Sequence, residues 1–201
     1  DYSYMVRALL TIFQANGDTE RLGQAQRLAE RMITLFWDPQ TGIFFDSDGL
    51  QKNLIHRRQT PTDGAIPAAN AVAIEALVKL SAFTDIERFR KIAVEGMLAT
   101  LPYSERGARS FSGTYVSYPY LVELPAVAVV IGNGKPSSLE AWQGELSATQ
   151  HFNALPVFSA EAQDDSKLAL FTGRMAPKGV TTMYLCRGQH CEAPRTLALP
   201  E

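Results

Sequence analysis

The helical spacing of apolar residues in the first half of the chain is its strongest constraint on the fold. Apolar side chains recur every three or four positions over residues 2–16, and again over residues 19–36. Such spacing puts them on one face of an α-helix. Asn16-Gly17 ends the first helix, and Asp18 or Thr19 caps the second. We therefore expect two antiparallel helices joined by a tight turn.

The same organisation recurs further along the chain. Residues 67–82 and 85–100 carry a second pair of helical patterns, and Asp18-Thr-Glu-Arg21 matches Asp85-Ile-Glu-Arg88 at an offset of 67 residues. A partial third copy begins at Ser110. Repeated helical hairpins bury their apolar faces only against one another, so they stack into solenoids or close into rings. Chance similarity between amphipathic helices is the alternative.

The last third of the chain has a different pattern. Residues 126–131 are apolar and mostly β-branched, as in a fully buried strand, and residues 137–151 begin with a capping-box spacing that predicts a helix. Three further short runs complete a small predicted sheet: residues 155–158, 168–171 and 181–186. The predicted fold is mainly α, with helical hairpins over residues 1–122 forming part of an α/α toroid and a small α/β segment over residues 123–201.

Charge and hydropathy exclude two classes of protein. The chain has 19 basic and 21 acidic residues, a net charge of −2, so it lacks the positive excess that holds nucleic acid. Its apolar runs are far shorter than the roughly 18 residues needed to cross a membrane. Two cysteines argue against a disulfide scaffold and favour a reducing, cytoplasmic location. The start within a helical pattern, without methionine, indicates a fragment of a longer protein.

Three further features have only weak support as functional sites. Gly132-Asn-Gly-Lys135 lacks the glycine and hydroxyl positions of a phosphate-binding loop, so an ordinary turn is favoured. Cys186 and Cys191 are separated by four residues, which leaves open a metal site, a reversible disulfide or, the favoured interpretation, two packed thiols. His151 ends a predicted helix, where a positive charge is favourable. No motif calls for a cofactor.

Residues 60–71, with the sequence TPTDGAIPAANA, are the most suggestive stretch for function. Asp63-Gly64 forms a turn, and Pro67 suits the first turn of a helix. Asp63 and Asn70 are therefore expected to face whatever lies over the start of this helix. Asp63 is an acid–base candidate, although an aspartate before a helix most often serves as its cap.

Residues at equivalent places complete the predicted site. If the hairpins close into a ring, the starts of the inner helices converge on one cavity, and carboxylates with aromatic rings there are typical of sugar binding. The catalytic candidates are Asp63, Asp1 and His56, the last a possible general base in a basic loop. The substrate-binding candidates are Asn70, Tyr2, Tyr4, Trp37 and Arg58, with Phe44 and Phe45 as further walls or as core residues. No metal site is predicted.

The order of four motifs resembles a known family. These are DYSYMVRALLTIFQANGD, FWDPQTGIFF, DGAIPAANAVA and the run Tyr184-Leu-Cys186-x4-Cys191-x2-Pro194. Together they resemble the thioredoxin-domain-containing proteins related to spermatogenesis-associated protein 20. The resemblance implies an N-terminal thioredoxin-like domain, outside these 201 residues, followed by an α/α toroid like those of six-hairpin glycosidases and N-acylglucosamine 2-epimerases.

The resemblance leaves two functional hypotheses. The first is a carbohydrate-related toroid that binds or processes a saccharide. The second is a non-catalytic scaffold, or a protein-interaction domain, that supports the thioredoxin-like domain. Either hypothesis makes the remainder of the parent polypeptide a partner. Ala68-Ala69 and Ala71 stand where the family pattern has a Ser-Gly pair and a Ser, a loss of hydroxyl groups that favours the second hypothesis.

Overall fold

The computed structural model describes residues 1–50, 54–105, 107–132, 154–160, 163, 168–177, 180–188 and 190–197. The chain divides into two compact units. The first comprises Asp1–Leu10, Gly23–Ser81 and Ile86–Glu123; the second comprises Thr11–Leu22, Ala82–Asp85 and Leu124–Glu201. The sequence-based boundary between residues 122 and 123 stays a prediction. Each unit is described by itself.

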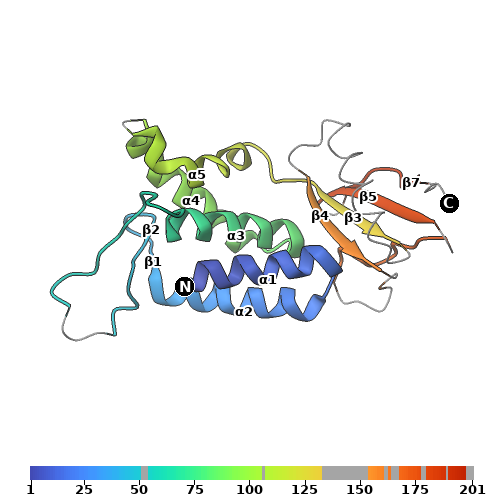
Figure 1. The fold of residues 1–201 in the computed structure, drawn as a ribbon, viewed down its shortest axis with the longest axis horizontal. Helices are drawn as coiled ribbons and strands as arrows, with labels where there is room; N and C mark the ends of the chain where they lie inside the picture. Colours follow the sequence, from blue (N-terminus) through green and yellow to red (C-terminus); the bar gives the residue numbers. More distant parts are fainter. Residues whose placement is uncertain are drawn as a thin grey trace. The chain divides into compact units, whose positions relative to one another are not determined.

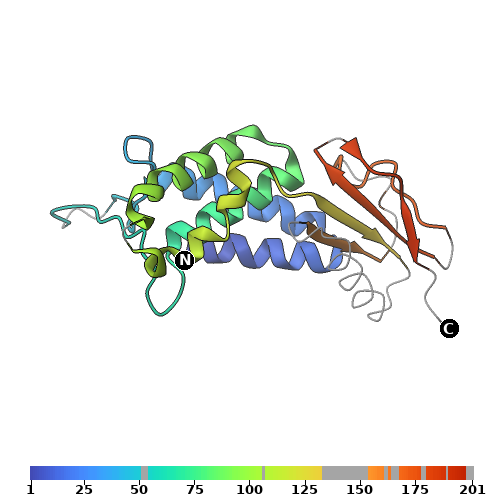
Figure 2. The same cartoon turned by 90° about the horizontal axis from the view of Figure 1, so that it is seen from above.

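Four long helices form where apolar periodicity predicted them. They are α1 (Tyr2–Asn16), α2 (Thr19–Phe36), α3 (Ala69–Thr84) and α4 (Glu87–Ser104), and they make two helical hairpins (Figures 1 and 2). The core of the first unit consists of buried apolar side chains from all four: Val6, Leu10, Ala29, Met32, Ile74, Leu77 and Met97. In α3 residues 71–74 are all buried, as expected for a helix that is apolar on every side.

The two hairpins begin their second helices differently, despite the sequence match between them. The amides of Glu20 and Arg21 donate to Oδ1 of Asp18 at 2.9 and 3.4 Å, so Asp18 caps α2 as predicted. Its counterpart Asp85 has a positive φ of 58°, and α4 has no side-chain cap at Ile86. The shared four-residue sequence therefore does not give the same local structure.

A small β-hairpin follows α2. Strand β1 (Trp37–Asp38) pairs antiparallel with β2 (Ile43–Phe44). Gly42 lies in the turn with φ of 70°, a conformation that L-residues rarely adopt. A Cβ atom at this position would lie 2.8 Å from Cβ of Ala99, so α4 also requires glycine here.

The predicted third helical repeat is wrong. The segment that includes Ser110 contains three short helical turns: η1 (Ala108–Phe111), α5 (Ser112–Tyr115) and η2 (Tyr118–Leu121). Pro119 has no amide hydrogen to donate within a longer helix, so it is restricted to the first turn of η2. The described residues therefore contain two long helical hairpins and no third.

The second unit contains a five-stranded mixed sheet. Its strands are β3 (Val127–Ile131), β4 (Leu155–Ser159), β5 (Thr181–Arg187), β6 (His190–Cys191) and β7 (Arg195–Leu197). The order is β4-β3-β5-β6, with β7 also pairing β5; β3 and β4 are parallel and the other pairs antiparallel. One face buries a cluster formed by Ala126, Ala128, Val130, Met183 and Leu185.

Predictions for this unit were partly right. Strands β3, β4 and β5 form as predicted, because continuous or alternating apolar runs become buried strands. The predicted strand at residues 168–171 is wrong: the segment forms turns, and Phe171 packs against Phe13, with the ring centres 6.2 Å apart. The predicted helix 137–151, the residues Asn133 to Lys135 and His151 lie outside the described residues.

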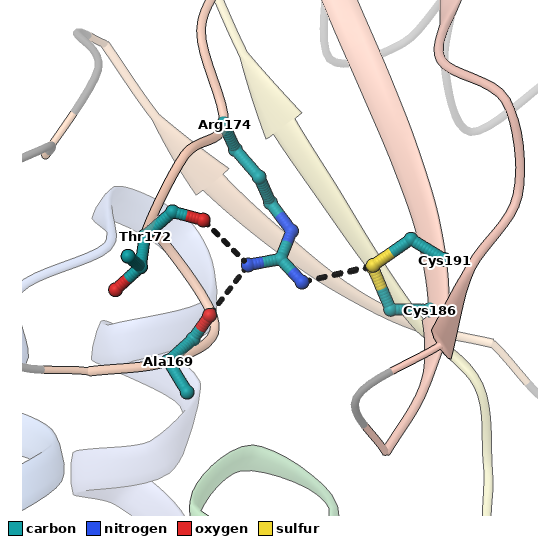
Figure 3. Close-up of a disulfide and its surroundings, with 5 residues drawn as sticks. All are labelled: Ala169, Thr172, Arg174, Cys186 and Cys191. Carbon is teal, nitrogen blue, oxygen red and sulfur yellow. Dashed lines mark hydrogen bonds between the residues drawn. A yellow bond between two sulfur atoms is a disulfide. The ribbon is translucent and has the colours of Figure 1, made fainter.

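The two cysteines do not remain packed thiols, which corrects the favoured sequence interpretation. Cys186 of β5 and Cys191 of β6 occupy directly opposite register positions and form a disulfide (Figure 3). In the described part of the chain, no group of three or more histidine, cysteine or acidic side chains has a metal-binding arrangement.

The expected fold class of a mainly α toroid is therefore wrong. The structure combines two helical hairpins with a five-stranded sheet and a two-stranded sheet, so the chain is of mixed α and β structure. Among the described helices none has the length and apolar character needed to cross a membrane.

Candidate functional site

A pocket of about 200 Å³ lies at the N-terminal end of α1 in the first unit. Three segments of the unit supply its wall: the start of α1, the end of α2 with the residues that follow β2, and the start of α3. The residues with rings or polar groups are Asp1, Tyr2, Ser3, Phe36, Phe44, Phe45, Asp46 and Asn70. The pocket thus has both an aromatic and a polar part.

The aromatic part is built by contacts between α1, α2 and the β-hairpin. The rings of Tyr2 and Phe36 lie 5.3 Å apart at an angle of 59°. Phe44 packs on Trp37 at 4.9 Å, so Trp37 supports the wall from behind and does not line the pocket. The guanidinium of Arg57 lies 3.9 Å from the centre of the Phe45 ring. Such paired rings are held in place and present fixed faces to a ligand.

Ser3 contributes a hydroxyl group with no protein partner. The residue is 4% exposed, and its Oγ has no hydrogen bond in the described part of the chain. A buried polar atom left without a partner costs about 1–3 kcal/mol. Ser3 also lines the pocket, so the pocket wall includes a residue with an unpartnered hydroxyl group.

Asp46 contributes a carboxylate with one engaged oxygen. The hydroxyl of Thr60 donates to Oδ2 of Asp46 at 2.6 Å, and Nε of Arg58 lies 4.0 Å from the same oxygen. Both contacts leave Oδ1 for a ligand. Arg58, predicted to bind substrate, thus acts on the site through Asp46 and is not a wall residue.

Asn70 shapes the pocket by binding the main chain. It is 2% exposed; its Oδ1 accepts from the amide of Phe44 at 2.7 Å, and its Nδ2 donates to the carbonyl of Phe44 at 3.1 Å. This pair of bonds fastens β2 to the first turn of α3. Each polar atom of the side chain has one main-chain partner, which gives Asn70 a structural role; these contacts do not test its predicted role as a hydroxyl-orienting group.

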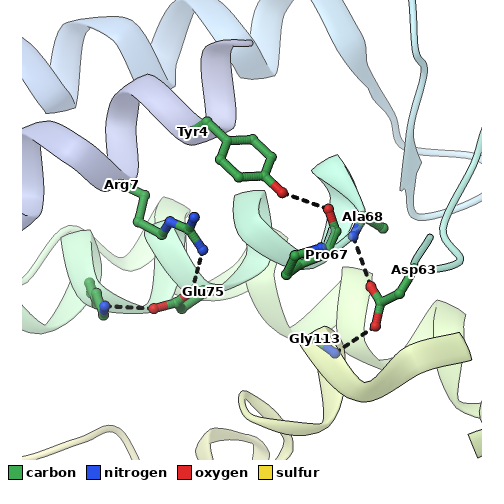
Figure 4. A network of polar contacts seen from close by, with 8 residues as sticks. Tyr4, Arg7, Asp63, Pro67, Ala68, Glu75 and Gly113 are labelled. Carbon is green, nitrogen blue, oxygen red and sulfur yellow. Dashed lines mark hydrogen bonds and ion pairs between the residues drawn. The ribbon is translucent and has the colours of Figure 1, made fainter. Parts of the chain in front are cut away.

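Asp63 joins three segments of the first unit (Figure 4). Its Oδ1 accepts from the amide of Ala68 at 2.8 Å, while Oδ2 accepts from the amide of Gly113 at 2.8 Å and from the hydroxyl of Ser112 at 2.9 Å. Burial opposes ionisation of this carboxyl group, but the three hydrogen bonds outweigh burial and lower its pKa. Asp63 therefore orders the loop and the starts of α3 and α5.

Tyr4 also serves the frame of the site (Figure 4). Its hydroxyl donates to the carbonyl of Pro67 at 2.7 Å, and the guanidinium of Arg7 lies 4.7 Å from the centre of its ring. Arg7 in turn lies 3.9 Å from Glu75, which also pairs with Lys79 at 2.6 Å. These contacts tie α1 to the loop before α3 and to α3 itself.

The predicted site residues thus separate into three groups. Asp1, Tyr2 and Asn70 line the pocket; Asp63, Tyr4, Trp37 and Arg58 support the structure around it; and His56 is exposed and is not a wall residue. Sequence reasoning missed Ser3, Phe36 and Asp46. Their only signal was proximity in the sequence to predicted residues. Ser3 lies between Tyr2 and Tyr4, Phe36 precedes Trp37, and Asp46 follows Phe45.

Comparison with known proteins identifies relatives of the chain. Human spermatogenesis-associated protein 20 is 27% identical over 98% of this chain, which is 25% of the human protein. The mouse protein of the same name is 39% identical over 42% of this chain and 11% of its own length. An uncharacterized protein of Caenorhabditis elegans is 24% identical over 96% of this chain, or 26% of that protein.

No established family profile matches the chain. The chain spans about a quarter of the length of the human relative. Its similarity to that relative covers nearly all of its residues, both helical hairpins and the sheet included. The chain is therefore related to spermatogenesis-associated protein 20, as the order of its motifs indicated.

Proposed function

We propose that the pocket of the first unit binds a saccharide or a similar polyhydroxylated ring. The observation that supports this most is the combination of aromatic walls with an unpartnered buried hydroxyl, that of Ser3, and an available carboxylate oxygen, that of Asp46. Sugar rings have apolar faces that stack on aromatic side chains, and their hydroxyl groups bond to carboxylates and hydroxyls at the ring edge.

The size of the pocket supports a small ligand. Its volume of about 200 Å³ is below the 300–1,000 Å³ typical of sites for drug-sized molecules. A single ring with its hydroxyl groups fits this volume better than an oligosaccharide does. The proposed ligand class is therefore a monosaccharide, or one terminal sugar of a glycan.

The proposal concerns binding, with Asp1 and Asp46 as the carboxylates at the pocket. Processing of the sugar would require one of them to act as a general acid or base. Asp63, the first acid–base candidate, has its two carboxylate oxygens occupied by three donors, which supports a structural role. His56 does not line the pocket.

Calorimetry with a panel of neutral and N-acylated monosaccharides tests the proposal. Asp46→Asn is expected to weaken binding of any sugar that binds by roughly tenfold, because a hydrogen bond to a charged acceptor contributes about 1.5 kcal/mol or more. Asp48→Asn is the matched control, since Asp48 lies in the same loop and does not line the pocket. Absence of binding by the folded chain to every sugar, or equal effects of the two substitutions, refutes the proposal.

A second function is favoured by a different observation. Asp63 and Asn70, the two polar residues of the motif, bind backbone groups and hold loops in place. This supports a non-catalytic scaffold that stabilises a thioredoxin-like domain of the parent polypeptide or presents a surface to it. Co-purification of such a domain with this chain, unchanged by Asp46→Asn, is the expected result; turnover of a sugar by the chain would refute it.

A further inference from the structure

The disulfide of the second unit connects two very different environments. Cys186 lies in the central strand β5 and is 1% exposed, whereas Cys191 lies in the two-residue strand β6 and is exposed. Gly188, with φ of 56°, lies in the turn between the two strands. One half of the disulfide is thus open to an attacking group, and the other half is sheltered.

An arginine side chain, Arg174, points toward the disulfide (Figure 3). Nη2 of Arg174 lies 2.9 Å from Sγ of Cys191 and 3.4 Å from Sγ of Cys186. Nη1 donates to the carbonyls of Ala169 and Thr172 at 2.5 and 3.4 Å, which fixes the guanidinium in place. The contacts hold a cation beside both sulfur atoms.

This cation has no carboxylate partner within the described part of the chain. Arg174 is 8% exposed, its Nε has no hydrogen bond, and its guanidinium contacts two carbonyls and two sulfur atoms. Burial lowers the pKa of its guanidinium, while Tyr184 acts in the opposite direction. A buried positive charge without an anion is costly, and a neutral disulfide does not compensate it. A thiolate in the same position would.

The exposed half of the disulfide opens into a second pocket. This pocket has a volume of about 250 Å³ and is lined by Leu185, Arg187, His190, Cys191 and Glu192. Arg187, His190 and Glu192 are the titratable groups on the hairpin around Cys191. A thiol compound can therefore approach Cys191 through a space bordered by both positive and negative side chains.

We propose that Cys186 and Cys191 form a thiol–disulfide exchange site that accepts two electrons from a dithiol. A thiolate of the dithiol attacks Sγ of Cys191; the Cys186–Cys191 bond breaks, and Cys186 leaves as a thiolate beside Arg174. The second thiolate of the dithiol then attacks the first dithiol sulfur, which is bonded to Cys191 in the mixed disulfide. Cys191 leaves as a thiolate. The dithiol is oxidised to a disulfide, the cysteine pair is reduced, and the two protons lost by the dithiol pass to the cysteines or to water.

The difference in exposure sets the direction of attack, and Arg174, which borders both sulfur atoms, stabilises the thiolate that leaves. A leaving thiolate departs faster when its pKa is low, and a neighbouring arginine lowers the pKa of a thiol from about 8.5 to about 3.5–7.5. Cys186 is the sulfur best placed to leave, since its side chain is sheltered and borders the guanidinium. Cys191 is the sulfur best placed to be attacked. This site is independent of the pocket in the first unit.

The first test uses the folded, oxidised 201-residue chain with reduced dithiothreitol as the dithiol. Acid quenching, alkylation and mass spectrometry measure the rate of reduction, and far-UV circular dichroism reports whether the chain stays folded. Complete reduction of a folded chain is expected. A disulfide that is reduced only when the chain unfolds would overturn the proposal, because structural disulfides behave in this way.

A second test examines Arg174. The pH profile of iodoacetamide alkylation gives the thiol pKa in the reduced chain, and Arg174→Met is expected to raise that of Cys186 by about one unit and to slow reduction roughly threefold or more. Arg174→Lys, which keeps the charge, is expected to preserve most of the acidity. Arg31→Met removes an equal charge from the exposed side of α2 as the control. Equal behaviour of Arg174→Met and Arg31→Met overturns the proposal.

A third test needs no substitution at Arg174, in case that variant does not fold. Reduced glutathione replaces dithiothreitol, and acid quenching traps the mixed disulfide on the wild-type chain. Peptide mapping is expected to place the glutathione on Cys191. A glutathione adduct found mainly on Cys186 would overturn the proposed order of attack.

Discussion

Replacing Asp63 by asparagine is the perturbation that most directly tests how the helical unit is held together. The substitution keeps the size of the side chain and removes its charge. In the wild-type chain, the amides of Ala68 and Gly113 and the hydroxyl of Ser112 all donate to the carboxylate. Asparagine has one acceptor oxygen, so its amide nitrogen must face one of the two backbone N–H groups.

The expected cost follows from these three contacts. The hydroxyl group of Ser112 can rotate and accept a hydrogen bond from the new asparagine amide. A backbone N–H group can only donate. One N–H group therefore loses its acceptor, and the other exchanges a charged acceptor for a neutral one. A hydrogen bond to a charged group contributes about 1.5–3 kcal/mol, and we expect Asp63→Asn to lower the free energy of unfolding by roughly 2–3 kcal/mol. Ser112→Ala removes a single exposed donor whose place water can take, and it is expected to cost less than about 1 kcal/mol.

The stability contributed by Asp63 is expected to depend on pH. The folded-state pKa of Asp63 is lower than its value of 3.8 in the absence of interactions. Its contribution to stability is therefore fully present above about pH 4 and is lost as the pH falls through the folded-state pKa. The difference in stability between wild type and Asp63→Asn should be largest at neutral pH and should shrink in acid.

Urea unfolding followed by far-UV circular dichroism at pH 7 and pH 3 measures both quantities. Glu105→Gln, at an exposed position near the end of α4, is the matched control for the loss of one carboxylate. An Asp63→Asn chain as stable as the control at pH 7, or one whose deficit is unchanged at pH 3, would show that this carboxylate does not organise the loop.

Three further substitutions test other parts of the structure by the same unfolding assay. Asn70→Leu should cost roughly 2–4 kcal/mol, because the buried amide and carbonyl of Phe44 lose both partners; a cost below that of Ser112→Ala would contradict this. Gly42→Ala should cost more than about 1 kcal/mol, since φ is 70° and Ala99 lies in the way. Gln40→Ala, at an exposed position of the same turn where only the backbone amide is bonded, should not. Asp18→Ala should lower the stability by about 1 kcal/mol, because α2 loses its cap. Asp18→Asn should retain most of that stability, because asparagine also caps helices.

The parts of the fold that the sequence predicted are those set by neighbouring residues. Helices α1 to α4 follow from apolar spacing within each segment, and the hairpin of β1 and β2 follows from local turn residues. Closure into a ring depends on how successive hairpins curve, which no local pattern records. The third predicted hairpin does not form for a local reason, because Pro119 interrupts helical hydrogen bonding in that segment.

The site shows the same division between local and distant information. A capping role for Asp63 was foreseeable from its place before a helix, but its contacts with Ser112 and Gly113 join residues about 50 positions apart. Strand β6 has two residues, too few for a periodic signal, so the pairing of Cys186 with Cys191 was one of several open alternatives. Arg174 had no signal at all, since its role depends on the turns at residues 168–174.

The contacts also separate stability from binding within one short motif. The side chains of Asp63 and Asn70 form hydrogen bonds with backbone groups. The unpartnered hydroxyl group at the pocket belongs instead to Ser3, in α1. Loss of sugar binding in Asp63→Asn or Asn70→Leu would therefore be ambiguous, because both substitutions disturb the frame of the pocket. Ser3→Ala should instead stabilise the free chain or leave it unchanged, because it removes a buried hydroxyl that has no partner. If Ser3→Ala also weakens the binding of a sugar, the loss of affinity must come from the contact between Ser3 and the ligand.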